Sequence, residues 1–265
     1  MVEPLSLAAN IAGVVIPALH GMRLLLRDLQ DIKDAPKNVK DLENELFLVD
    51  RSLSSLQAIE PEDIGSLGSE VTDNVRSTIE ICSAACDKFR TDLQQWTRHS
   101  GGEKLSWRDR SNIGFWKQAH IKSIQSQLQN CQVNITSVIS TATLYSSLQH
   151  TQITEEIRKA LLVKEDELKA ASQTAGQQRE LVNSQLQTLS IQDSEPQETA
   201  KPLEEEKEYL AASQELLREL LKKLQEASTS QTPPVVNVTF GSQNSGLQMG
   251  TNNGTMNGLV FGGKG

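Results

Sequence analysis

Apolar residues recur every three or four positions along most of this chain, and that spacing restricts what it can fold into. After Pro36 the pattern is carried by Val39, Leu42, Leu46, Val49, Leu53 and Leu56. After Gly68 it resumes with Val71, Val75, Ile79, Cys82, Cys86, Phe89 and Leu93. Each set lies on one face of an α-helix, whereas a strand would require strict alternation. We therefore expect long amphipathic helices that each bury one face.

The pattern continues to residue 189 and predicts an all-α protein. It runs through residues 113–148 and then through a more polar stretch that ends at Leu189. Aromatic residues make up only 4% of the chain, while Leu, Gln, Glu, Lys and Ala are abundant. This composition favours helices over a β-sandwich. We predict a helical bundle of four to five long helices over residues 1–190.

Residues 191–227 are predicted to form a polar hinge followed by a charged helix. Glutamates stand at the start of that helix, and Lys222 and Lys223 lie near its end. Charges placed in this way complement the helix dipole. Its leucines could pack on the bundle or on another copy of the chain. The alternative is a solvated helix that covers one flank of the bundle.

Residues 228–265 have a different composition and are predicted to form a separate tail. They contain half of the chain's 16 glycines and a single charged residue, Lys264. Within them, residues 235–240 are β-prone and uncharged. A flexible linker is one interpretation of such a segment, and a self-assembling strand is the other.

No constellation of residues indicates catalysis. The four histidines lack neighbours that would make a catalytic or metal motif, and no phosphate-binding loop occurs. Cys82 and Cys86 share a helix face, but without further ligands nearby they are interpreted as small buried core residues. We expect no enzyme activity, no metal and no cofactor. An unrecognised hydrolase built from scattered Ser, Cys and His is a further alternative that no motif supports.

The net charge of −8 argues against nucleic acid as a partner, because a binding face would need clustered Lys and Arg. Three cysteines without regular spacing indicate a reducing compartment rather than a disulfide framework. We therefore expect a cytoplasmic protein at rest.

The N-terminal segment has no charged residue from Pro4 to Met22. Its length approaches the ~20 residues that a helix needs to cross a membrane, but Pro17 and His20 weaken a span. Two interpretations remain: a buried core helix kinked at Pro17, and a helix that inserts into membranes conditionally. The positions expected to contact lipid are Leu5, Leu7, Ile11, Val14, Val15, Ile16, Leu19, Leu24 and Leu25.

The tail contains a nine-residue pattern, N-x-G-x-Q-x-G-x-N, that is symmetric about Gln248. In a strand, Leu247 and Met249 face one side and Gln248 faces the other. Stacking identical chains in register places each amide above its counterpart at a spacing of ~4.7 Å, so that amide ladders form. The pattern therefore predicts templated cross-β assembly. The expected amyloid core consists of Asn244, Gly246, Leu247, Gln248, Met249, Gly250 and Asn252.

These residues carry a family resemblance. Leu247-Gln248-Met249-Gly250 resembles the core of the RIP homotypic interaction motif of animal necroptosis proteins, and the full pattern resembles the pseudo-palindromic amyloid motif of filamentous fungi. Residues 3–13 are similar to the beginning of fungal HeLo-like domains. Residues 3–13 and the motif in the tail together resemble the HELLP class, in which a HeLo-like helical domain precedes the pseudo-palindromic amyloid motif.

The resemblance implies an executor of programmed cell death. In such proteins a NOD-like receptor with a matching motif forms an amyloid template, and the tail of the executor converts on it. The helical domain then moves from the cytoplasm to the plasma membrane and permeabilises it. The implied partners are further copies of this chain, the receptor and plasma membrane lipids. The alternative is a helical adaptor whose tail recruits a partner by homotypic contact without membrane activity.

Overall fold

The computed structural model describes residues 4–32, 36–97, 118–150, 154–191 and 197–230, and these residues confirm the all-α prediction. The helices are α1 (Pro4–Gln30), α2 (Lys37–Gln57), α3 (Pro61–Ser66), α4 (Ser69–Trp96), α6 (Gln118–His150), α7 (Glu155–Ile191) and α8 (Gln197–Ser230). No strand occurs in these ranges.

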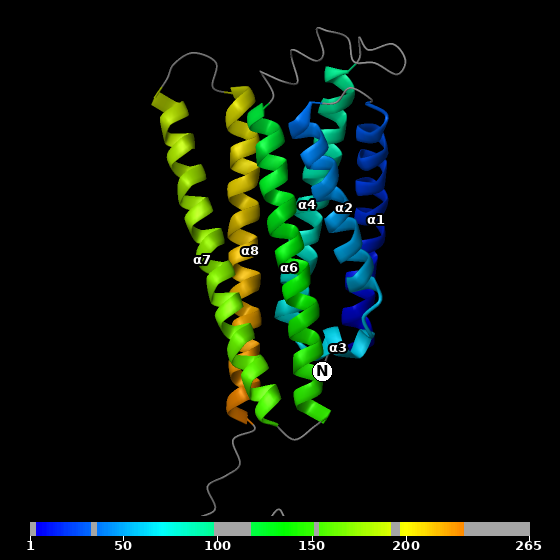
Figure 1. Cartoon of the computed structure of the whole chain (residues 1–265), viewed down its shortest axis with the longest axis vertical. Helices are drawn as coiled ribbons and strands as arrows, with labels where there is room; N and C mark the ends of the chain where they lie inside the picture. Colours follow the sequence, from blue (N-terminus) through cyan, green and yellow to red (C-terminus); the bar gives the residue numbers. More distant parts are fainter. Residues whose placement is uncertain (1–3, 33–35, 98–117, 151–153, 192–196, 231–265) are drawn as a thin grey trace, which may run out of the picture.

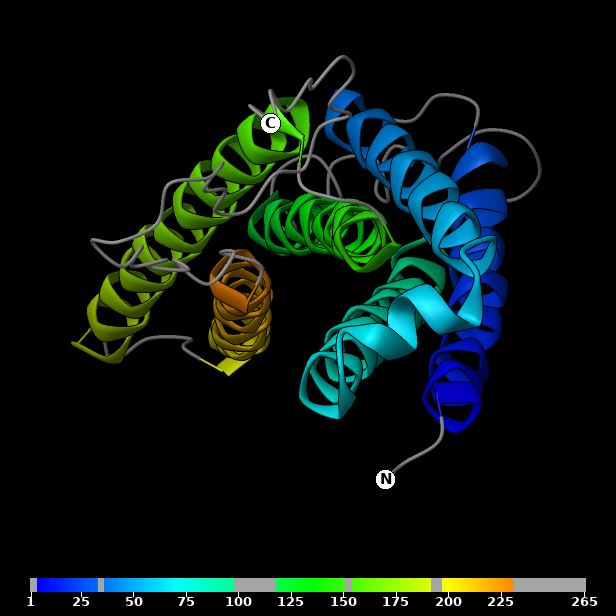
Figure 2. The same ribbon diagram turned by 90° about the horizontal axis from the view of Figure 1, so that it is seen from below.

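The long helices run side by side along one axis, and the short α3 lies across one end of the bundle (Figure 1). Helices α1 and α7 occupy opposite edges, which is clearest in the view along the bundle (Figure 2). Helix α1 packs chiefly on α2, α3 and α4, whereas α7 packs chiefly on α8. Helix α6 lies between these two groups and contacts α2, α4 and α8.

The apolar stripes predicted for α2 and α4 are part of the core. All of the predicted positions on both helices are buried. Each fully buried aliphatic side chain stabilises the fold by about 1.5–3 kcal/mol relative to an exposed one, so the stripes determine which face of each helix turns inward. The spacing of three or four residues was therefore sufficient to place these side chains.

The described part of residues 1–191 contains five long helices, as predicted, and α8, from the segment predicted as a charged helix, packs within the bundle as a sixth. Its contacts are with α4, α6 and α7. The buried leucines of this helix are Leu210, Leu216, Leu217, Leu220 and Leu224. Of the alternatives for these leucines, packing on the bundle is the one observed.

The helices extend further than expected into the polar hinge predicted at the start of residues 191–227. Helix α7 reaches Ile191 and α8 begins at Gln197. Pro202 lies inside α8, where its missing N–H costs one backbone hydrogen bond. Ser123 of α6 donates a hydrogen bond to the carbonyl of Pro202 at 3.0 Å, and this contact attaches the start of α8 to the bundle.

A buried polar contact fixes α8 against α6. Asn134 Nδ2 donates to the hydroxyl oxygen of Tyr209 at 3.2 Å, and Ser213 Oγ donates to Asn134 Oδ1 at 3.0 Å. All three residues are buried. Buried polar groups require partners, so sliding α8 along α6 would leave these groups unpaired. The contact therefore selects one register between the two helices.

Candidate membrane-acting helix

The N-terminal helix is part of the core in this structure. Ile11, Val15, Leu19 and Leu25 are buried, with at most 4% of each residue exposed. Val14 and Leu24 are half-buried, and Ile16 is exposed over 56% of its surface. The side chains of Leu5 and Leu7 lie outside the described residues. Most of the predicted lipid-contacting positions that the structure describes therefore pack against protein.

Pro17 and His20, which weaken α1 as a membrane span, lie on its solvent-exposed side. Gly13, Pro17 and His20 are all exposed, next to Ile16. The helix continues through Pro17, whose ring removes the backbone bond to the carbonyl of Gly13. Among the described helices, none combines the length and the apolar character that crossing a membrane requires.

Two polar contacts attach α1 to its neighbours. Arg23 Nε lies 2.6 Å from Asp50 Oδ1 of α2, and this hydrogen bond raises the pKa of the Arg23 guanidinium. Asp28 Oδ2 accepts hydrogen bonds from Arg90 Nε at 2.7 Å and from Gln94 Nε2 at 3.0 Å, both on α4. Partly exposed ion pairs contribute about 0.2–1 kcal/mol each. Apolar packing therefore holds α1 more strongly than these pairs do.

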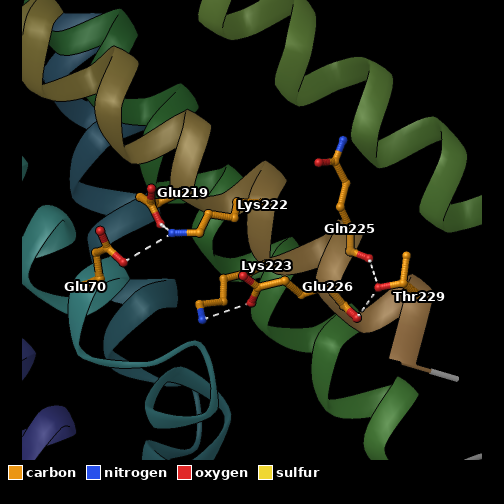
Figure 3. A network of polar contacts seen from close by, with 7 residues as sticks. All are labelled: Glu70, Glu219, Lys222, Lys223, Gln225, Glu226 and Thr229. Carbon is orange, nitrogen blue, oxygen red and sulfur yellow. Dashed lines mark hydrogen bonds and ion pairs between the residues drawn. The ribbon is translucent and has the colours of Figure 1, made fainter.

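The last turns of α8, which precede the tail, contact the first turn of α4 (Figure 3). Lys222 Nζ lies 3.1 Å from Glu219 Oε2 on its own helix and 3.6 Å from Glu70 Oε2 on α4. These two carboxylates, Glu219 foremost, raise the pKa of the Lys222 ammonium. Lys223 Nζ pairs with Glu226 Oε2 at 3.2 Å. Sequence spacing predicts the pairs within α8 but not the contact with Glu70.

The corner between α3 and α4 contacts both α8 and α1. Gly68, at this corner, has φ of +89°, a left-handed conformation that glycine adopts without strain. The end of the Lys223 side chain lies 3.8 Å from the position that a Cβ of Gly68 would take. Ile64 and Leu67 of the same corner are buried, and α3 packs on α1. The helix that bears the tail and the apolar N-terminal helix therefore share one structural neighbour.

The cysteines belong to the core. Cys82, Cys86 and Cys131 are free and buried, which confirms the interpretation of the first two as core residues. Hydrogen bonds to Cys131 and Cys86, together with burial, raise the pKa of the Cys82 thiol. Within the described ranges, no group of three His, Cys, Asp or Glu side chains is placed to hold a metal ion.

The predicted amyloid core lies outside the described residues. This applies to Asn244, Gly246, Leu247, Gln248, Met249, Gly250 and Asn252.

The fold defines a helical-bundle protein with its apolar N-terminal helix packed at one edge. The sequence profile of a family described as "Pigment biosynthesis cluster protein PigL N-terminal" matches residues 2–232. The chain belongs to this family, which is related to the HeLo-like fungal domains. The match covers every helix described here and stops just past the end of α8 at Ser230. No curated protein and no solved structure matches the chain.

Proposed function

We propose that this protein is an amyloid-controlled executor of cell death that acts without enzymatic chemistry. A receptor with a matching motif, of the NOD-like class, templates the tail into a cross-β fold. The helical domain is then delivered to the plasma membrane and permeabilises it. The observation that carries this proposal is the position of two helix ends: α8, the last described helix before the tail sequence, ends at the end of the bundle where α1 starts (Figure 1).

Assembly through the tail would bring the N-terminal ends of many α1 helices close together. Chains in a cross-β stack are spaced by about 4.7 Å, whereas a single helix with its side chains is about 10 Å wide. Folded bundles therefore crowd one another around such a stack. Because α8 ends at the end of the bundle where α1 starts, crowding brings many weakly apolar segments together, and their combined membrane affinity exceeds that of one copy.

Helix α1 is placed to leave the bundle. It lies at an edge and packs chiefly on three neighbours, and its Ile16 side chain is already exposed. Its release would present Val15, Leu19 and Leu25 to lipid. The relation of the chain's family to HeLo-like domains supports the same interpretation.

The amyloid part of the proposal is tested on the fragment 228–265. We expect this fragment to give fibre reflections at about 4.7 Å and about 10 Å, the strand and sheet spacings of cross-β structure. The Gln248→Pro fragment is the matched control, because proline removes a ladder donor. A wild-type fragment that stays monomeric, even when seeded, would refute templating.

The membrane part is tested with a reversible lock on α1. A Cβ placed on Gly21 lies 2.8 Å from Asp87 Oδ1 and 3.6 Å from Asp87 Cγ, so Gly21→Cys with Asp87→Cys places two thiols close enough for a disulfide between α1 and α4. Residues 231–265 are replaced by a drug-inducible oligomeriser. We expect clustering to cause vesicle leakage after reduction and none while the disulfide is closed. Gly21→Cys alone is the control.

Leakage that is equal in the locked and reduced states would exclude release of α1. Deleting residues 1–22 is not an equivalent test. That deletion removes Ile11, Val15 and Leu19 from the core and would unfold the bundle.

One observation favours a second function, that of a helical adaptor. The buried side chains of α1 fill the core, as they would in a protein with no membrane activity. In that case the tail recruits a partner by homotypic contact and clustering leaves vesicles intact. The absence of leakage in the reduced, clustered protein would therefore support the adaptor.

A further inference from the structure

A cavity of about 490 Å³ lies between the beginning of α6, the later part of α7 and the beginning of α8. The beginnings of α6 and α8 lie at the end of the bundle opposite to the start of α1 (Figure 1), and the residues that line the cavity place it at that end. Its size falls within the range of about 300–1,000 Å³ that is usual for small-molecule sites. The lining residues that matter here are Lys122, Ser126, Leu181, Gln185, Leu203 and Glu206.

Glu206 is a buried acid without a cationic partner. Only 7% of the residue is exposed, and no ion pair joins it to any part of the chain that the structure describes. The hydroxyls of Ser126 and Ser123 lie against its carboxylate. Ser123 donates its proton to the carbonyl of Pro202 at 3.0 Å, which leaves Ser126 as the hydroxyl donor to Glu206. Burial raises the pKa of Glu206 despite these contacts.

A carboxylate in this environment favours a cationic donor. Removing an ionised acid from water is costly unless it is paired and hydrogen-bonded, and Ser126 satisfies only part of that requirement. Glu206 lines the cavity together with Ser126, whose hydroxyl lies against its carboxylate, so we expect a ligand in the cavity to reach this group.

Lys122 supplies the opposite charge at the same cavity. Its side chain is exposed, it lies one helical turn before Ser126 on α6, and it has no ion pair with a described residue. A simple cation at Glu206 would be repelled by Lys122, and a simple anion at Lys122 would be repelled by Glu206. A ligand that carries both charges avoids both penalties.

We propose that this cavity binds a small zwitterion with a primary ammonium group and an anionic group. The ammonium group donates hydrogen bonds to Glu206, and the carboxylate or phosphate of the ligand pairs with Lys122. Leu181 and Leu203 contact the carbon atoms between the two charges. A primary ammonium is required because it carries three N–H donors, whereas a trimethylammonium group carries none.

Free metabolites and lipid headgroups both offer this chemistry, and the position of the cavity favours a free zwitterion. The choice of a free zwitterion over a lipid headgroup rests on the proposed function, in which the start of α1 faces the membrane. The cavity lies at the other end of the bundle, away from the lipid headgroups.

Titration calorimetry on the full chain tests the proposal, with O-phosphoethanolamine and γ-aminobutyrate as probes. We expect both zwitterions to bind, and phosphocholine, ethylammonium and inorganic phosphate to bind at least about tenfold more weakly. Glu206→Gln and Lys122→Gln should each weaken binding of the zwitterions by at least about tenfold. Glu208→Gln and Lys201→Gln, which change exposed residues of α8 outside this cavity, should leave binding unchanged.

Several results would overturn the proposal. These are absence of binding by both zwitterions, equal binding of phosphocholine, and unchanged binding in folded Glu206→Gln protein, with folding checked by circular dichroism. Glu206-dependent capture by phosphatidylethanolamine vesicles without binding of the free probes would overturn the free-metabolite source. Vesicle leakage plays no part in the calorimetry, so failure of the proposed function and failure of this site are distinguishable.

Discussion

Individual side chains of α1 differ in ways that hydropathy does not show. Leu25 is fully buried, whereas Ile16 is more than half exposed on the same helix. Both were expected to contact lipid because both are strongly apolar. Their energetic roles in the folded bundle are therefore different.

Leu25→Ala should lower the free energy of unfolding by about 2–5 kcal/mol, because it removes buried methyl groups and leaves a cavity. Ile16→Ala should change it by no more than about 0.5 kcal/mol, since the side chain is mostly in water. Urea unfolding followed by circular dichroism measures both. Similar losses in the two variants would contradict the packing of α1 described here.

Glu206 gives a prediction about pH. Its pKa is raised in the folded protein, so folding favours the protonated acid, and the ionised form weakens the fold above that raised pKa. The penalty disappears once the pH falls below the ordinary glutamate value of about 4.3. Glu206→Gln should therefore melt at a higher temperature than wild type at pH 7.5, and the difference should shrink toward pH 4. A pH-independent difference in melting temperature would be inconsistent with this explanation.

At the scale of helices, the apolar spacing was sufficient for α2 and α4 and for the described part of α6, where Ile121, Leu128 and Val138 are buried. It identified their buried stripes because one residue in three or four must face the core. It missed the contact of Asn134 with Tyr209 and the burial of Glu206, because polar residues that pair in space leave no periodic signal in the sequence.

Whether α1 packs in the core or inserts into a membrane could not be predicted, for a different reason. An apolar helix avoids water equally well in a protein core and in a bilayer, so the composition of residues 4–22 is compatible with both. The contact between Lys222 and Glu70 was also inaccessible, because it joins segments that are far apart in the chain. The predicted amyloid core remains a prediction from the symmetry of its motif.

The attachment of α1 can be weakened without changing α1 itself. Asp50→Asn removes the partner of Arg23, and Arg90→Gln removes the principal partner of Asp28. Together we expect them to loosen α1 by about 0.4–2 kcal/mol, from about 0.2–1 kcal/mol for each ion pair. Hydrogen exchange of the α1 amides should quicken, and leakage on clustering should increase.

The matched control for this variant is Arg76→Gln, which breaks an ion pair within α4 and leaves the contacts of α1 intact. Faster exchange across the whole bundle, rather than in α1, would show that the two pairs do not act on this helix specifically.

For the whole molecule, the direction of the helices determines where clustering acts. Helix α7 ends and α8 begins at the end of the bundle opposite to the start of α1 (Figure 1). An oligomeriser inserted between these two helices should therefore cause much less vesicle leakage than the same module attached after residue 230. Equal leakage from the two positions would show that the shared location of the start of α1 and the end of α8 is irrelevant.

The buried contact of Asn134 has a consequence for how the chain is made. Asn134, Ile135 and Thr136 together form an acceptor sequence for N-linked glycosylation. A sugar would be attached to Nδ2 of Asn134, the same atom that donates to Tyr209 between α6 and α8. A glycan there would replace one of the two Nδ2 hydrogens and would have no room between the buried Asn134 and Tyr209, so it would separate the two helices. The bundle therefore assembles only from chains whose Asn134 carries no sugar.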